Sequence, residues 1–158
     1  MAQYKCEHFK IYELVDPGTY KQWGQLCWKF FDPGALEALD ILRDIFGSLT
    51  VNNWKWGGPF KWSGLRIDGC GYGSEYSAHQ RGCSFDAKSK KFSGTQMRRL
   101  LRQYDGNQLK ITYAEWKKLR KRFFELITEI ELGTTTWIHI AKTNRFQFKW
   151  IQKPKAKK

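Results

Sequence analysis

The spacing of apolar residues predicts one well-formed helix early in the chain. Leucine, isoleucine and phenylalanine recur every three or four positions over residues 33–46, which is the period of an amphipathic helix packed on a core. Asp32 and Pro33 are typical of an N-cap and a first helical residue, and Gly47 is typical of a helix end.

Two more helices are expected in the second half of the chain. One is expected from about residue 95 to residue 104, followed by a turn at residues 105–107. Thr112 and Glu115 have the spacing of a capping box, which predicts a helix that begins there and extends to about Phe124.

Strands are expected around these helices. The segments with strand-like patterns are residues 49–54, 85–87, 127–132, 136–141 and 146–150. A turn at residues 133–135 predicts that the third and fourth of these segments form a hairpin. Residues 57–76, with six glycines and one proline, are expected to be loops with a short strand near residues 64–67.

The order of these elements predicts the fold class. Helices and short strands are intermixed, which indicates one α+β domain over residues 1–152. Residues 1–31 are expected to be irregular or partly stranded, and the basic tail at residues 153–158 is expected to be disordered.

The charge of the chain is strongly positive. It has 28 Lys and Arg against 15 Asp and Glu, a formal net charge of +13, which attracts polyanions without specifying a fold. Nucleic acid and an anionic cell wall or membrane surface are both open as partners. The first residues hold no apolar run, and no stretch approaches the roughly 20 apolar residues of a membrane span, so synthesis in the cytoplasm is expected.

The four cysteines do not form a zinc-ribbon pattern. Cys6, Cys27, Cys70 and Cys83 contain no C-x-x-C pair, and free thiols are expected in a reducing compartment. A thiol ligand or a redox role at Cys70 or Cys83 is a further alternative.

Histidine is scarce, so any histidine-dependent site must use a small set of residues. The chain has His8, His79 and His139. Asp86 follows His79 by seven positions, and Gly82 between them permits a sharp turn. Two imidazoles and one carboxylate suit Zn²⁺ and leave a fourth position for water. The alternative is that His79 is an ordinary polar loop residue and His139 a hydrogen-bonded residue at the edge of the core.

Three motifs resemble a known family. The segment of residues 77–86 resembles the S-x-H-x-x-G-x-A-x-D signature of the zinc D-Ala-D-Ala carboxypeptidase superfamily, with Ser84 where the family has Ala. That superfamily includes VanX-type dipeptidases, phage L-alanyl-D-glutamate endolysins and Hedgehog amino-terminal domains. Trp137-Ile138-His139 resembles the later W-x-H strand of a phage branch, and the sequence Ser-Gly-Leu-Arg at residues 63–66 resembles its S-G-x-R element. The order and rough spacing agree across residues 50–142.

The resemblance implies a fold and a set of roles. The fold would be Hedgehog-like or DD-peptidase-like, with a small antiparallel sheet flanked by helices. The residues that would hold zinc are His79, Asp86 and His139. Ser77 would support the loop or touch substrate, Trp137 would contribute to substrate binding, and Arg66 would polarise the scissile carbonyl or bind a substrate carboxylate.

The general base departs from the common family pattern. Many members have Glu three residues before the last His, and this chain has Thr136 there. Other branches place the base on the neighbouring strand, where Glu129 and Glu131 are the candidates and Glu131 is favoured. If neither carboxylate reaches the metal, the chain would bind zinc without catalysis.

The expected function is a zinc metallopeptidase that cleaves peptidoglycan stem peptides at bonds involving D-amino acids. It would be of the D,D-carboxypeptidase or L-alanyl-D-glutamate endopeptidase type, a monomer from a phage or prophage, acting on the anionic wall after release. One alternative is a non-catalytic zinc-binding domain. Another is a metal-free nucleic-acid-binding protein, suggested by a basic helical face and by an aromatic cluster that could equally wall a peptide groove or fill the core. The residues of these two features are Arg98, Arg99 and Arg102, and Trp54, Trp56, Phe60 and Trp62.

Overall fold

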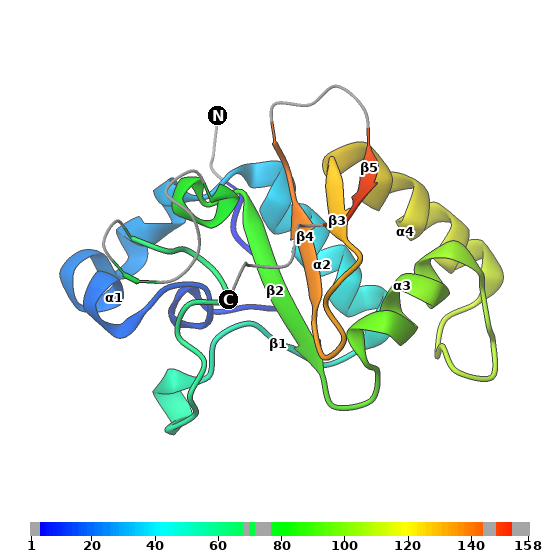
Figure 1. Ribbon diagram of the computed structural model, residues 1–158, viewed down its shortest axis with the longest axis horizontal. Coiled ribbons are helices and arrows are strands. Elements are labelled where there is room, and N and C mark those ends of the chain that lie inside the picture. The colour runs from blue at the N-terminus through cyan, green and yellow to red at the C-terminus, as the bar shows by residue number, and fades with distance from the viewer. Residues whose placement is uncertain (1–3, 68–69, 72–76, 144–147, 153–158) are drawn as a thin grey trace.

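A five-stranded mixed sheet forms the centre of the computed structural model, which describes residues 4–67, 70–71, 77–143 and 148–152 (Figure 1). The strand order is β1-β2-β4-β3-β5. The strands are β1 (Leu49–Thr50), β2 (Ser84–Ser89), β3 (Glu129–Glu131), β4 (Ile138–Ala141) and β5 (Lys149–Ile151). The α+β class is confirmed.

The sheet is not purely antiparallel. The β3–β4 hairpin is antiparallel as predicted, but β5 pairs with β3 in parallel. The expectation of an antiparallel sheet is therefore wrong at this edge. In the strand order, β3 lies between β4 and β5. Both β3 and β5 run opposite to β4, so β5 and β3 run in the same direction.

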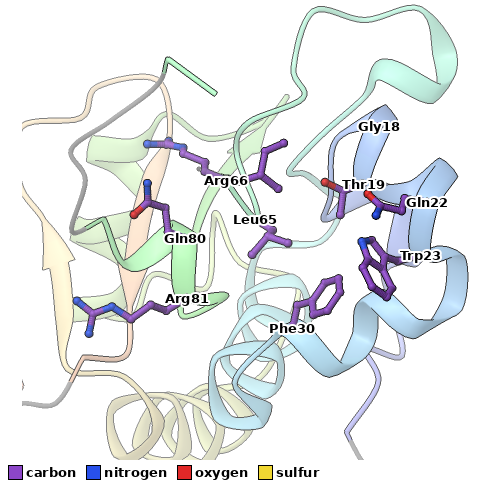
Figure 2. Close-up of a pocket in the computed structure, with 10 residues that line it drawn as sticks. Gly18, Thr19, Gln22, Trp23, Phe30, Leu65, Arg66, Gln80 and Arg81 are labelled. Carbon is purple, nitrogen blue, oxygen red and sulfur yellow. The ribbon is translucent and has the colours of Figure 1, made fainter. Parts of the chain in front are cut away.

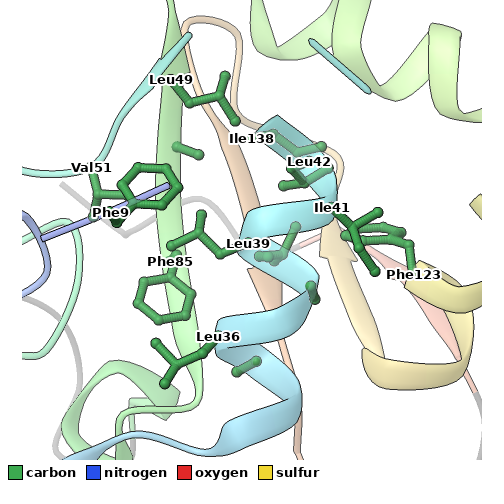
Figure 3. Packing of buried hydrophobic residues seen from close by; sticks show 14 of the residues in the cluster. Phe9, Leu36, Leu39, Ile41, Leu42, Leu49, Val51, Phe85, Phe123 and Ile138 are labelled. Carbon is green, nitrogen blue, oxygen red and sulfur yellow. The ribbon is translucent and has the colours of Figure 1, made fainter. Parts of the chain in front are cut away.

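The two faces of the sheet differ in chemistry because successive side chains of a strand point to opposite sides. One face is apolar and packs on α2 (Pro33–Phe46), with α4 (Tyr113–Leu126) packed against α2 in turn. Figure 3 shows Leu36, Leu39 and Leu42 of α2 beside Phe85 of β2 and Ile138 of β4. Burying each such side chain contributes about 1.5–3 kcal/mol, so this face anchors the strands.

The opposite face carries the polar residues of the three central strands. By alternation from the buried apolar set, these are Ser84, Asp86, Lys88, Glu129, Glu131 and His139. The same register that buries the core therefore gathers the candidate site residues on one surface.

The two helices with strong sequence signals begin where predicted. Asp32 accepts a hydrogen bond from the amide of Ala35 at 3.0 Å and caps α2. Thr112 and Glu115 form both bonds of the predicted capping box at the start of α4. The remaining long helix, α3 (Gly94–Arg102), lies within two residues of its expected bounds.

Most of residues 11–30 is helical, which corrects the expectation of irregular or partly stranded structure there. The 3-10 helices η1 (Ile11–Glu13) and η2 (Gly24–Phe30) flank α1 (Pro17–Trp23). Asp16 caps α1 by accepting from two backbone amides, with Pro17 at the first helical position. This is the same Asp-Pro start as in α2, but a helix of two turns shows too little apolar periodicity to be recognised.

Other expected strands are shorter or absent. The strand over residues 49–54 is limited to β1, because residues 54–56 form the 3-10 helix η3 (Trp54–Trp56). No strand forms at residues 64–67; this segment is held by single bonds, from Leu65 N to Leu14 O at 2.8 Å and from Arg66 N to His79 O at 3.2 Å. The last strand begins at residue 149, and the predicted disordered tail at 153–158 lies outside the described residues.

Within the part of the chain that the structure describes, no helix has the length and apolar character needed to cross a bilayer.

Candidate metal centre

A tight turn places His79 next to the start of β2. The 3-10 helix η4 (Ala78–Arg81) begins after Ser77, whose hydroxyl accepts from the amide of His79 at 3.3 Å. Gly82 ends it in the left-handed region, with φ 63°, and a Cβ there would lie 2.0 Å from the carbonyl oxygen of Phe30. Glycine is required on both grounds. The predicted turn is confirmed, and Ser77 supports the loop.

The three predicted ligand residues meet at one point. Asp86 of β2 is paired with His139 of β4 in the sheet register, and Nδ1 of His139 lies 2.6 Å from Oδ1 of Asp86. Nε2 of His79 lies 3.5 Å from Oδ2 of Asp86 and 3.3 Å from Nδ1 of His139. The candidate ligand atoms all lie within 4.8 Å of one another. His8 lies elsewhere and pairs with Asp44.

The geometry fits a metal ion. Zinc bonds of about 2.0–2.1 Å in a tetrahedron separate neighbouring ligand atoms by roughly 3.3 Å. The two distances from Nε2 of His79, 3.3 and 3.5 Å, are close to that value. The third distance, 2.6 Å between Nδ1 of His139 and Oδ1 of Asp86, is that of a hydrogen bond, so these two atoms would move apart on binding an ion. The three residues lie close enough together to hold one.

The hydrogen bonding of His79 leaves the correct nitrogen available. Its Nδ1 lies 2.7 Å from the carbonyl oxygen of Gly64, which can only accept. Nδ1 must therefore carry the proton, and the lone pair of Nε2 faces Asp86 and His139. A backbone carbonyl behind the ring is the usual partner of a metal-binding histidine, because it fixes both tautomer and orientation.

The protonation states also suit metal binding. Burial raises the pKa of Asp86, but its interactions with the imidazoles of His139 and His79 outweigh burial and hold that pKa well below its usual range. Burial lowers the pKa of His79, against the opposing effect of Asp86. At neutral pH Asp86 is therefore ionised and His79 is neutral, which are the forms that bind a metal.

Comparisons of the chain with protein-family models, with curated proteins and with solved structures found no match.

Arg66 contacts a ligand residue directly. Its Nη2 donates to Oδ2 of Asp86 at 2.8 Å, and its Nε donates to the carbonyl of Trp62 at 2.7 Å. The guanidinium is thus oriented at the edge of the cluster. A role toward substrate stays a prediction, to which the structure adds a role in holding Asp86.

Lys88 is a site neighbour that the sequence analysis did not single out. Its Nζ donates to the hydroxyl of Ser63 at 2.6 Å and to the backbone carbonyl of Asp86 at 3.1 Å. Burial lowers the pKa of Lys88 to about 8. Strand alternation could have placed it on the face of Asp86, two residues earlier, but its burial depends on the loop that carries Ser63.

The register favours Glu131 over Glu129 as the carboxylate nearer the metal centre. Glu129 lies opposite Ala141, and Ile130 lies opposite Ile140, so continuing this antiparallel register sets Glu131 opposite His139. Glu129 is buried, and its carboxylate accepts from the hydroxyl of Thr143 at 2.9 Å. Glu131 is half-buried on the same strand face.

Trp137 precedes β4, and its backbone is fixed by α3. A Cβ on Gly94 would lie 1.9 Å from the carbonyl oxygen of Trp137, so the start of α3 packs directly on this segment. Its indole is half-buried, and its part in substrate binding stays a prediction. Thr136, which occupies the common family position of the base, is exposed.

Two features linked to nucleic-acid binding differ from expectation. Arg98 is not part of an exposed basic face: it is 5% exposed and donates to the hydroxyl of Thr134 at 2.9 Å and to that of Thr95 at 3.2 Å. Only Arg99 and Arg102 of the predicted face are exposed. The aromatic cluster does not fill the core, because its four rings are exposed or half-buried.

Cys6, Cys27 and Cys83 are free thiols, as expected. Burial raises the pKa of Cys83, which makes this thiol a weaker nucleophile and ligand. Within the described residues, neither Cys70 nor Cys83 belongs to the metal-binding group.

Proposed function

We propose that this protein is a zinc peptidase that hydrolyses peptidoglycan stem peptides at a bond involving a D-amino acid. The observation that carries the proposal is the convergence of His79, Asp86 and His139, with the lone pair of His79 Nε2 directed into the cluster. These are the positions at which the sequence resembles the ligands of the zinc D-Ala-D-Ala carboxypeptidase superfamily.

The chain would divide the chemistry among a few residues. Zinc, when bound, supplies a Lewis acid and lowers the pKa of a water molecule. Glu131 would take the proton that water loses and deliver it to the leaving nitrogen as the peptide C–N bond breaks. Arg66, already turned toward Asp86, would donate to the negative charge that develops on the carbonyl oxygen.

The choice of peptidoglycan as substrate rests on the three motifs together. The net charge of +13 also suits an enzyme that works on an anionic wall, because opposite charge raises the local concentration of enzyme on its substrate. Action on the wall after release from the cell follows from the same proposal.

The test combines metal content with hydrolysis. Purified protein is analysed for zinc and incubated with soluble muropeptides, whose products are identified by mass spectrometry. His79→Ala is expected to lose both zinc and hydrolysis. His8→Ala is the matched control, because His8 pairs with Asp44 at the surface and should leave both unchanged. Full hydrolysis by the His79→Ala protein would overturn the mechanism.

A non-catalytic zinc domain is the second candidate. It is favoured by Thr136 at the usual position of the catalytic Glu and by Arg66, which already occupies one oxygen of Asp86. This candidate predicts about one zinc per chain, lost in His79→Ala, with no hydrolysis of any muropeptide. The same experiment therefore separates it from the peptidase.

A further inference from the structure

A cavity of about 590 Å³ opens beside the metal centre. One wall comes from α1 and η2 and includes Gln22, Trp23 and Phe30. In Figure 2 these residues face Leu65, with Gln80 on the far side of Leu65. Its volume falls in the range of about 300–1,000 Å³ that is typical of pockets for small ligands.

The wall that carries Leu65 and Gln80 is shared with the metal centre. Arg66 lines the cavity and donates to Oδ2 of Asp86. Leu65 follows Gly64, whose carbonyl orients His79, and Gln80 follows His79 on η4. A ligand in the cavity would therefore sit against the loops that position the cluster.

The opposite wall presents aromatic surface to solvent. Trp23 is 45% exposed and Phe30 is 36% exposed, and their rings make an edge-to-face contact with centroids 5.7 Å apart. Two large rings held together at the mouth of a cavity offer a rigid apolar platform. Such aromatic residues bind ligands with little loss of side-chain entropy.

The polar side chains around this platform include both amides and guanidinium groups. Gln22 and Gln80 provide amides that both donate and accept, and Arg66 and Arg81 provide guanidinium donors. Among the residues that the structure describes, none of those lining the cavity is acidic. A side chain of a peptide would use the apolar surface alone. A sugar ring would use both the apolar platform and the amides. Its C–H face packs on an aromatic ring, while its hydroxyl and acetamido groups form hydrogen bonds with the amides.

We infer that this cavity binds the N-acetylated sugar that carries the stem peptide, while the peptide extends past Arg66 to the metal centre. The inference rests on the proposed function, because it names a second part of the same substrate. It adds that Trp23 and Phe30 give the protein a preference for peptides still attached to glycan.

The test measures binding in the Glu131→Gln protein, in which the substrate is expected to stay intact. The probes are N-acetylmuramoyl-L-alanyl-D-isoglutamine and the same dipeptide without its sugar, titrated by calorimetry. The sugar-bearing probe is expected to bind at least about tenfold more tightly, a difference of about 1.4 kcal/mol. Trp23→Ala should abolish that preference, and Trp23→Phe should restore part of it.

Trp56→Ala is the matched control, because Trp56 is 63% exposed and does not line the cavity. It should retain the full preference. Equal binding of the two probes, or a preference that survives Trp23→Ala, would overturn the inference.

Because binding is measured without turnover, the two proposals can fail separately. A sugar preference that depends on Trp23 supports the cavity inference even in a protein that hydrolyses nothing. Hydrolysis of both probes at equal kcat/KM by the unaltered enzyme supports the peptidase and overturns the sugar site.

Discussion

Asp86 and His139 are directly opposed in neighbouring antiparallel strands, with Nδ1 of His139 2.6 Å from Oδ1 of Asp86. The residues on either side, Phe85 and Ile140, point to the other face and are fully buried in the core. A slip of one residue would send an ionisable side chain into that core, so the register is strongly fixed. Formation of the core therefore brings together two of the three candidate metal ligands.

Replacing the carboxylate should abolish metal binding while the register persists. In Asp86→Asn the amide keeps the shape of the side chain but replaces a carboxylate ligand of zinc by a neutral, weaker one. Zinc content is expected to fall from about one per chain to background by elemental analysis. Ser84→Ala, at the other end of the same strand face, should keep its zinc. Retention of zinc by Asp86→Asn would show that the ion is bound elsewhere.

The register favours Glu131 over Glu129 as the general base of the proposed peptidase. Glu131→Gln is expected to lower kcat by about 10²–10⁴-fold with zinc content unchanged, because it removes proton transfer but no ligand. Glu129→Gln is the matched variant on the same face of β3 and should have a much smaller effect. If only Glu129→Gln lost activity, the base would be Glu129, which accepts from Thr143.

Local signals in the sequence predicted much of the fold. The starts of α2 and α4 follow from cap residues that act within one turn, and the turn at His79 follows from Gly82. Two features depend on contacts between distant segments and were not predicted: the parallel pairing of β5 with β3 and the burial of Arg98.

The choice between Glu129 and Glu131 also depends on pairing between segments that are distant in the sequence. Both residues share a strand face in the sequence pattern, and only the pairing of Ile130 with Ile140 sets Glu131 opposite His139. Lys88 is a further case, because its charge near Asp86 becomes buried only when the loop of Ser63 packs over it.

The metal-free protein is expected to lose stability in acid. His79 has a folded pKa below its ordinary value of 6.5, so its contribution is present above that value and is lost as pH falls below it. Asp86 also has a lowered pKa, so its contribution is lost at still lower pH. Thermal unfolding of chelator-treated protein from pH 8 to pH 4 should show a falling Tm. His79→Gln should flatten the part of the curve near pH 6, and an unchanged curve would contradict this assignment.

Arg98 should be important for stability, whereas its neighbour should not. Arg98→Met leaves Thr134 without its donor inside the protein, and an unsatisfied buried polar group costs about 1–3 kcal/mol. Arg99→Met removes the same charge from an exposed position and should change stability by about 0.5 kcal/mol or less. Urea unfolding of both variants measures the difference, and equal midpoints would contradict a structural role for Arg98.

The positive charge is concentrated on one part of the chain, which predicts where a polyanion binds. Residues 88–122 contain twelve Lys and Arg against two acidic residues, and Lys117 and Lys121 of α4 are exposed. Reversing both to Glu should weaken binding to purified anionic cell walls and reduce its salt dependence, because fewer counterions are released. Hydrolysis of soluble muropeptides should be unchanged.

Reversal of Lys5 and Lys10, which are also exposed but lie outside this segment, is the control and should have a smaller effect. If the Lys117 and Lys121 variant instead lost chelator-insensitive affinity for single-stranded nucleic acid and kept its affinity for walls, the surface would serve nucleic-acid binding.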